Sequence, residues 1–200
     1  MTPAPAILIL AAGASSRMGE ADKLLMKLDG VPCLRIMAER AVATGMRVLV
    51  TVPADRPARE AALSGLSVTI VPVRDAAGGM GRSIAAGVSA LPRDVTGVII
   101  QPADMPEITT LDLQLFAKAH EAHPNRIWRA ITETGSPGHP VLFPAALFSA
   151  LTALRGDEGA RSVIQNHENN LQGITLGGER ARLDLDTPEA WERYLSDRLR

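Results

Sequence analysis

The chain has 200 residues, enough for one α/β domain, and 46% of them are hydrophobic, enough for a sizeable core. Only 3% are aromatic, so that core must be built from aliphatic side chains. The net charge of −1 does not suggest general binding to nucleic acid or to a membrane surface, and any basic patch must be local.

The single cysteine, Cys33, excludes an intrachain disulfide and agrees with a reducing compartment. Its apolar neighbours favour a buried structural thiol over a nucleophile. No signal peptide is apparent at the N-terminus, and no apolar run is long enough to span a membrane. We therefore expect a cytoplasmic protein without nucleic-acid or membrane partners. We also expect a single domain over residues 1–200, in which residues 1–5 form a flexible N-terminus.

Strand-forming segments recur along the chain, with helical patterns between them. The predicted strands are Ala6–Leu10, Arg47–Val52, Val68–Val71, Gly97–Gln101, Ile127–Thr132 and Pro140–Phe143. The predicted helices are Leu34–Ala43, Arg82–Leu91, Leu111–His123 and one that starts at Pro188. This alternation predicts βαβ units with right-handed crossovers. The expected fold is a three-layer α/β/α arrangement around a mainly parallel, Rossmann-like sheet.

The helix predicted at Leu111–His123 has an apolar stripe that we expect to face the core. The stripe consists of Leu111, Leu115, Ala119 and Ala122. The histidines of this part of the chain, His120 and His123, are interpreted together with His167 as surface or loop residues. One cysteine and four scattered histidines give no zinc-binding pattern.

The first strand ends in a loop that could bind an anion. Gly13, Ala14 and Ser15 leave the backbone N–H groups of the loop accessible, and Arg17 and Lys23 add positive charge on the same side. A polyphosphate is the natural ligand for such a loop. A tight strand-to-helix turn that carries surface charges explains the composition of the turn equally well.

Two aspartates follow apolar segments far apart in the sequence. Asp104 lies just beyond the most apolar strand, in a loop fixed by two prolines, and Asp186 precedes a helix start in which Thr187 fits the N-cap and Pro188 the N1 position. Ligands in open α/β sheets bind beyond the carboxyl ends of the strands. Two carboxylates there suit Mg²⁺ bound to phosphates. An aspartate in an ordinary turn also explains Asp104.

Two further motifs adjoin predicted elements. The glycine-rich stretch Gly78–Gly81 precedes a helix that carries Ser83, and a helix N-terminus there could bind an anion, a base or a ribose. A flexible loop that caps the helix is the alternative. His139 lies between Gly138 and Pro140, where a structural or substrate-positioning role is favoured over general-base chemistry.

The order of these motifs resembles that of nucleotidyltransferases with the GT-A-like α/β fold. The shared motifs are Leu10-Ala11-Ala12-Gly13, Arg17-Met18-Gly19, Lys23, the acidic loop Pro102–Pro106 and Asp186 before Thr187-Pro188-Glu189. Three further stretches resemble the branch of molybdenum cofactor cytidylyltransferases: Gly79–Ser83 with Gly87, Gly138–Pro140 and Gly156–Arg161. The acidic loop of that family often reads Asp-Gln-Pro, whereas this chain has Asp104-Met105-Pro106.

The resemblance implies a role for each matching residue. The nucleotide would contact Leu10, Ala11, Ala12, Gly13, Arg17, Lys23, Ser83 and Asp104. Among these, Lys23, Arg17 and Asp104 would be catalytic, Asp104 and Asp186 would hold Mg²⁺, and Gly138, His139 and Pro140 would contact the acceptor. Members that use guanine nucleotides tend to carry Leu-Ala-Gly-Gly, so Ala12 favours cytidine.

The implied reaction transfers CMP from CTP to a molybdopterin-type molybdenum cofactor and releases pyrophosphate. The alternatives are transfer to another phosphorylated acceptor, such as a sugar or polyol phosphate, and transfer from GTP. A protein of another class, a carrier or chaperone of the molybdenum cofactor with little turnover, also fits the motifs. A molybdenum hydroxylase apoenzyme is the partner that the resemblance implies.

Overall fold

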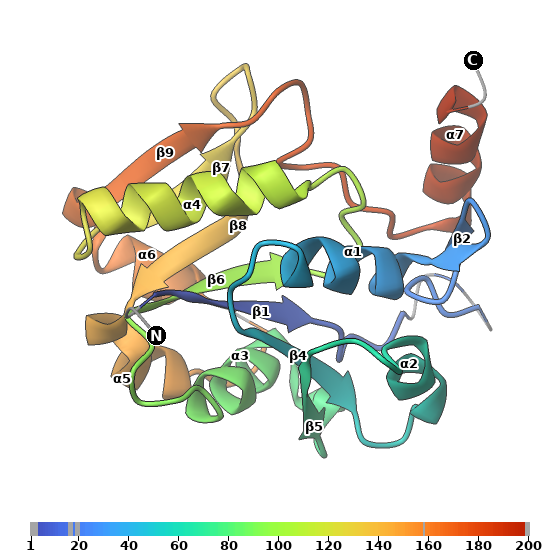
Figure 1. Ribbon diagram of the computed structural model, residues 1–200, viewed down its shortest axis with the longest axis horizontal. Coiled ribbons are helices and arrows are strands. Elements are labelled where there is room, and N and C mark those ends of the chain that lie inside the picture. The colour runs from blue at the N-terminus through green and yellow to red at the C-terminus, as the bar shows by residue number, and fades with distance from the viewer. Residues whose placement is uncertain (1–3, 16–17, 19–20, 158, 199–200) are drawn as a thin grey trace.

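The computed structural model describes residues 4–15, 18, 21–157 and 159–198. Within these residues the chain forms a seven-stranded sheet in the order β5-β4-β1-β6-β8-β7-β9 (Figure 1). Its strands are β1 (Ala6–Leu10), β4 (Val48–Pro53), β5 (Thr69–Val73), β6 (Gly97–Pro102), β7 (Ile127–Ile131), β8 (Pro137–Pro144) and β9 (Leu171–Thr175). The short strands β2 (Lys27–Leu28) and β3 (Val31–Pro32) pair separately as a hairpin.

The sheet is mainly parallel, as the alternation of elements predicts. β1 pairs in parallel with β4 and β6, β4 pairs in parallel with β5, and β7 pairs in parallel with β9. The exception is β8, which is antiparallel to both β6 and β7. Ile7, Leu8 and Ile9 are completely buried, which is typical of a central strand covered on both faces.

Helices cover both faces of the sheet and complete the predicted three layers (Figure 1). On one face lie α1 (Cys33–Val42) and α4 (Thr110–Ala122), whose buried side chains share a core with Trp191 and Tyr194 of α7 (Pro188–Arg198). On the other face lie α3 (Met80–Ser89), α5 (Phe148–Thr152) and α6 (Arg161–Gln165). The short helix α2 (Pro57–Ala62) follows β4.

The prediction for the buried face of α4 is wrong. Leu111 and Leu115 are 71% and 46% exposed, whereas Leu113 and Phe116 are completely buried. Leu113, Phe116 and His120 recur at helical spacing on one face, and packing of this face with its large Phe116 ring buries it in place of the stripe at 111 and 115. The helix begins with a capping box, in which the side chain of Thr109 accepts a hydrogen bond from the N–H of Asp112 and the carboxylate of Asp112 accepts one from the N–H of Thr109.

The interpretation of His120 as a surface residue is also wrong. The side chain of His120 lies on the buried face of α4, where it is 2% exposed. Its Nε2 lies 3.1 Å from the hydroxyl oxygen of Thr96, and burial lowers its pKa below the ordinary histidine value. His120 is therefore a core residue held by a neighbouring hydroxyl.

β8 begins at Pro137, three residues before the predicted start. Pro137 pairs with Ile131 of β7 across a register shift, so the segment that contains Gly138 and His139 is part of the sheet. The expected flexible N-terminus comprises residues 1–5, of which residues 1–3 lie outside the described residues, and Pro5 is buried. Across the helices that the structure describes, none combines the length and apolar character needed to cross a membrane.

Candidate functional site

A cavity of about 320 Å³ lies at the carboxyl ends of β1 and β6, next to the start of α3. We call it the strand-end cavity. Six of the residues expected to contact the nucleotide line it: Leu10, Ala12, Gly13, Lys23, Ser83 and Asp104. Ala11 does not line it, because its side chain is completely buried in the core. The prediction for Arg17 lies outside the described residues.

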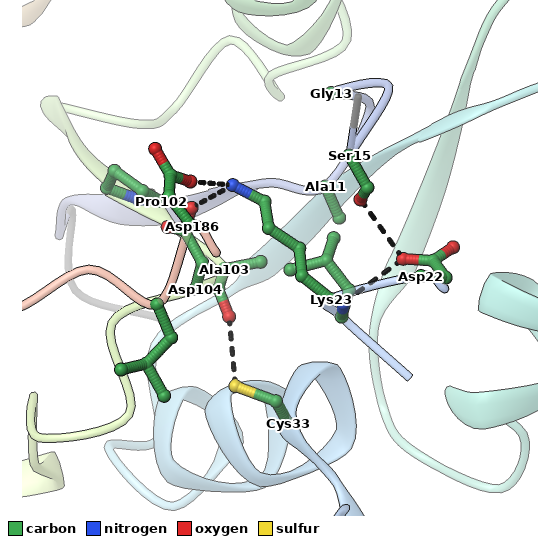
Figure 2. Close-up of polar contacts among 12 residues, drawn as sticks. Ala11, Gly13, Ser15, Asp22, Lys23, Cys33, Pro102, Ala103, Asp104 and Asp186 are labelled. Atoms are coloured by element: carbon green, nitrogen blue, oxygen red, sulfur yellow. Dashed lines mark hydrogen bonds and ion pairs between the residues drawn. The ribbon is translucent and has the colours of Figure 1, made fainter. Parts of the chain in front are cut away.

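At this cavity the side chain of Lys23 lies between two carboxylates that are distant in the sequence (Figure 2). Its Nζ donates hydrogen bonds to Asp104 Oδ2 and Asp186 Oδ1. The three side chains are only 15%, 13% and 26% exposed. Burial alone would lower the pKa of Lys23, but the two carboxylates outweigh it and raise the pKa, so the ammonium stays charged.

The loops that carry the two aspartates are joined through the backbone. The N–H of Leu185 donates to the carbonyl of Asp104 at 3.0 Å. The carbonyl of Leu185 in turn accepts a hydrogen bond from the indole Nε1 of Trp191 at 3.1 Å, and Trp191 is only 1% exposed. A buried indole of α7 therefore holds Asp186 beside Asp104, although 82 positions separate them in the numbering.

The cluster has a negative potential that suits a cation. The pKa of the exposed Asp184 is raised by partial burial and by the nearby charges of Asp186 and Asp104. Within the part of the chain that the structure describes, no group of three or more histidine, cysteine or acidic side chains is arranged to hold a metal ion. A cation beside Asp104 and Asp186 would have at most these two carboxylates as protein ligands and would complete its shell with water or with oxygens of a substrate.

Arg59 fixes the loop that follows β1. Its side chain is completely buried, and its guanidinium donates to the carbonyls of Ala11 and Gly13 at 2.5 and 2.8 Å. It also donates to the hydroxyl of Ser15 at 3.0 Å and, as a bidentate pair, to the carboxylate of Asp22 at 2.7 and 2.9 Å. One residue of α2 therefore binds the segment after β1 at Ala11, Gly13, Ser15 and Asp22.

Arg59 is a site residue that was not predicted, because little in the local sequence indicates that its side chain is buried. It is one of 21 lysines and arginines, and it lies in a short helix whose own pattern is unremarkable. Its partners lie 37 to 48 positions away, as only the fold reveals. The one usable hint is Asp22, an acidic residue next to Lys23 in a loop that otherwise suits an anion.

Asp22 is the acidic centre of this network. Its carboxylate accepts a hydrogen bond from the Ser15 hydroxyl at 3.3 Å (Figure 2). It also accepts hydrogen bonds from the Leu24 N–H at 3.1 Å and from Arg56 at 3.3 Å. Burial alone would raise its pKa, but the bonds and charge of Arg59 lower it overall. The anchored Asp22 fixes the backbone from which Lys23 extends toward Asp104.

The glycine-rich stretch before α3 packs against the loop that contains Gly156 and Asp157. Gly79 has φ +92°, and a Cβ there would lie 2.4 Å from the carbonyl oxygen of Gly156. The N–H of Gly81 donates to the same oxygen at 2.8 Å. Close approach of the two loops thus accounts for both glycines, and it places Ser83, which is 5% exposed, on the wall of the strand-end cavity.

Cys33 is the structural thiol that its neighbours predict. It is completely buried, and its Sγ lies 3.5 Å from the carbonyl of Ala103 (Figure 2). Burial raises its pKa to about 12, so the nucleophilic thiolate is not formed at neutral pH. Cys33 supports the backbone next to Asp104.

The three residues expected at the acceptor differ in their surroundings. A Cβ at Gly138 would lie 1.9 Å from the carbonyl oxygen of Ala181, so packing alone requires glycine there. Pro140 is buried in β8. His139 lines a second cavity of about 460 Å³ between the sheet and α3 and α6, which we call the sheet-face cavity. Burial and the charge of Arg129 lower the pKa of His139 to about 4, so its ring is neutral at pH 7.

Comparison with protein families gives one match that covers most of the chain. Residues 7–171 match the family described as the MobA-like NTP transferase domain. This range runs from the second residue of β1 to the first residue of β9. It includes Lys23, Arg59 and Asp104, but it stops before Asp186.

Similar proteins were found among both sequences and structures. The chain is 30% identical over 198 residues to a probable molybdenum cofactor guanylyltransferase of Natronomonas pharaonis, covering 92% of this chain and 94% of that protein. It is 35% identical over 127 residues to the bifunctional protein GlmU of Kineococcus radiotolerans, covering 61% of this chain but only 26% of GlmU. The crystal structure of Rv0371c of Mycobacterium tuberculosis in complex with manganese has the same fold, with a TM-score of 0.81, 22% identity and coverage of 96% and 98% of the two chains.

Proposed function

Because this chain belongs to the family with the MobA-like NTP transferase domain, we propose that it transfers CMP from CTP to a molybdopterin-type molybdenum cofactor and releases pyrophosphate. The observation that carries the proposal is the arrangement of Lys23 between Asp104 and Asp186 at a cavity beyond the strand ends. The relative named a molybdenum cofactor guanylyltransferase, which aligns over nearly the whole chain, supports this class of acceptor.

In this proposal the strand-end cavity takes the nucleotide. Gly13 and the backbone around it lie against the triphosphate, which Lys23 neutralises, with Arg17 in the same role. Leu10, Ala12 and Ser83, which line the cavity, contact the base and ribose, and Ala11 contributes backbone only. Arg59 does not reach the ligand in this scheme. It holds the carbonyls of Ala11 and Gly13 away from the phosphates, so that those oxygens do not oppose the negative charge.

The donor set fits a divalent cation. Two carboxylate oxygens already converge on one positive charge, the ammonium of Lys23, and hard divalent cations prefer such oxygen ligands. Asp104 and Asp186 would hold the ion, which we propose to be Mg²⁺, and the manganese complex of Rv0371c supports a divalent metal in this fold. When bound, the cation would offset charge on the phosphate oxygens.

The reaction needs no covalent enzyme intermediate. An oxygen of the acceptor's terminal phosphate attacks the α-phosphorus of CTP, a new P–O bond forms, and the bond from the α-phosphorus to the bridging oxygen breaks. Pyrophosphate leaves with that oxygen and its electron pair. The chain contributes positioning by the loop that Arg59 fixes, and it contributes charge stabilisation by Lys23, whose ammonium neutralises the leaving pyrophosphate.

The acceptor lies on the side of β8 in this proposal. His139 lines the sheet-face cavity next to the strand-end cavity, and Gly138 and Pro140 shape the backbone on either side of it. A neutral imidazole there positions the acceptor by hydrogen bonding. A molybdenum hydroxylase apoenzyme is the proposed recipient of the product.

GTP is a second candidate donor. The relative named a guanylyltransferase favours GTP, whereas Ala12 on the cavity wall favours CTP through the resemblance of the loop to cytidylyltransferases. The acceptor and the chemistry are the same in both versions.

Pyrophosphate release, measured with each of the four NTPs and with and without the molybdenum cofactor, tests the proposal. We expect release that requires both the cofactor and a divalent cation and that is fastest with CTP. A faster rate with GTP than with CTP would identify GTP as the preferred donor. An absence of release with every NTP would refute nucleotidyl transfer to this acceptor.

A further inference from the structure

The sheet-face cavity combines apolar walls with two positive charges. Ile100, Val141 and Phe143 of the sheet and Ile84 of α3 line it. Arg129 of β7 and Arg161, the first residue of α6, line it as well. An apolar cavity that contains basic side chains is suited to an organic anion.

Arg129 is a partly buried cation without an ion-pair partner in the described part of the chain. It is half-buried, and its Nε donates to the carbonyl of Gly138 at 3.2 Å. Within residues 4–15, 18, 21–157 and 159–198, no carboxylate forms an ion pair with Arg129 or Arg161. Burial and the nearby charge of Arg161 lower the pKa of Arg129. Arg129 is partly removed from water without a carboxylate partner, which is costly, and a bound anion would lower that cost. Arg161, whose side chain is exposed, would add a second positive charge to the same anion.

The other polar groups of the cavity do not cancel this charge. Asp157 and Glu168 also line it, and their side chains are exposed, as is that of Arg161, but neither carboxylate forms an ion pair with the half-buried Arg129. His139 is neutral, and its buried Nδ1 has no hydrogen-bond partner among the described residues. An unpartnered buried nitrogen next to Arg129 is a hydrogen-bonding position open to a ligand.

The sheet-face cavity adjoins the strand-end cavity. Met80 and Asp157 line both, and the side chain of Met80 is 46% exposed although it is large and apolar. A single elongated molecule that passes Met80 would therefore have one end near Lys23 and Asp104 and its other end near Arg129.

We propose that the sheet-face cavity binds the body of the acceptor and that Arg129 and Arg161 bind a negatively charged group of that acceptor remote from the reacting phosphate. The ligand class is an elongated organic anion with a planar or apolar middle part. This inference rests on the proposed function for the identity of the acceptor. It is independent of which NTP is the donor.

The test is a binding experiment with pterin-6-carboxylate, a fluorescent planar anion, titrated with the full-length protein. We expect Arg129→Gln and Arg161→Gln each to weaken binding roughly tenfold to a hundredfold, because each removes a charge-assisted hydrogen bond. Arg129→Lys, which keeps the charge, should retain more affinity than Arg129→Gln. This difference would show that the lost affinity comes from the missing charge and not from a loss of the fold. Arg126→Gln is the matched control, because Arg126 bonds the carbonyl of Asn169 at 3.3 Å and does not line the cavity.

Two further ligands separate the sources of the effect. Neutral 6-hydroxymethylpterin should bind more weakly to the wild type and should be insensitive to Arg129→Gln. Inorganic phosphate should compete poorly, because it lacks the apolar body, and equal competition by phosphate would contradict the ligand class. CTP and GTP affinities should stay within twofold in every variant.

The proposal is overturned if pterin-6-carboxylate binds the two glutamine variants as tightly as the wild type. That outcome leaves pyrophosphate release untouched. Conversely, the wild type could release no pyrophosphate while the variants bind pterin-6-carboxylate more weakly than the wild type does. That result would refute the proposed function and support the anion site. The two failures are therefore distinguishable.

Discussion

The two cavities differ in how their charges are balanced. Around the strand-end cavity the buried cations are paired within the protein, Lys23 with two aspartates and Arg59 with Asp22. In the sheet-face cavity Arg129 and Arg161 have no such partner among the described residues. Paired charges hold loops in place before a ligand arrives, whereas unpaired charges are neutralised only when a ligand binds. The difference is the one expected between the reaction site and the acceptor-recognition site that we propose for the two cavities.

The largest effect on stability is expected from the loss of Arg59, which pairs with Asp22. We expect Arg59→Met to lower the free energy of unfolding by about 3–5 kcal/mol, because the carboxylate of Asp22 is left partly buried without its main partner. Urea denaturation measures this loss. Arg56→Ala is the control, because its more exposed pair with Asp22 should contribute under about 1 kcal/mol.

A double variant distinguishes pairing from packing. If the loss in Arg59→Met comes from the stranded carboxylate, Asp22→Asn in the same chain should restore part of it. Equal stability of Arg59→Met and the wild type would mean that the loop does not depend on this residue.

Lys23→Met removes the positive charge shared by Asp104 and Asp186. We expect kcat/KM for nucleotidyl transfer to fall about 10²- to 10³-fold, since a preorganised charge in a transfer site is worth that much. Initial rates of pyrophosphate release measure it. Lys27→Met, on the exposed face of β2, is the control and should leave the rate unchanged. A similar decrease in both variants would contradict the proposed charge stabilisation by Lys23.

The pKa of His139 reports on the burial of its ring and, to a smaller extent, on the charge of Arg129. Its pKa in the folded protein is about 4, below the ordinary value of 6.5, so the folded state disfavours its protonation. The unfolded chain takes up this proton first, so stability is full above pH 6.5 and falls as the pH drops toward 4. The full loss from this one group is about 3 kcal/mol.

Urea denaturation of the wild type and His139→Gln at pH 7 and pH 4.5 measures the effect. The wild type should lose more stability between the two pH values than the variant, because only the wild type has this titrating ring. Parallel losses in both proteins would show that burial and the charge of Arg129 do not lower the pKa of His139 in the folded protein.

A smaller effect concerns the cap of α7 beside Asp186. The hydroxyl of Thr187 accepts a hydrogen bond from the N–H of Ala190 at 3.2 Å, so Thr187→Ala should cost about 1 kcal/mol of stability. Thr109→Ala, in the cap of α4, should cost a similar amount. Only Thr187→Ala should also slow pyrophosphate release, because only Thr187 adjoins Asp186. Equal rates of pyrophosphate release in the two variants would show that the cap of α7 does not affect the activity.

The sequence predicts the parts of this molecule that depend on local pattern. The strands β1 and β6, the loops after them, and the capped start of α7 at Thr187 follow from apolar runs and cap chemistry. The structure brings Lys23, Asp104 and Asp186 together because the carboxyl ends of parallel strands share one edge of the sheet.

The parts that could not be predicted depend on contacts between distant segments. In α4, residues 111 and 115 form as good an apolar stripe as residues 113 and 116, and the structure selects the second through packing. No local pattern predicts that Arg59 is buried, or that Arg129 and Arg161 line the same cavity.

The most direct test of nucleotidyl transfer is the mass of the product. The purified protein is incubated with the molybdenum cofactor, Mg²⁺ and CTP or GTP, and the pterin product is analysed by mass spectrometry. The account predicts a product heavier than the acceptor by one nucleoside monophosphate less water, in amounts equal to the pyrophosphate released. An unmodified acceptor after NTP hydrolysis, or a product that carries a bare phosphate, would contradict it.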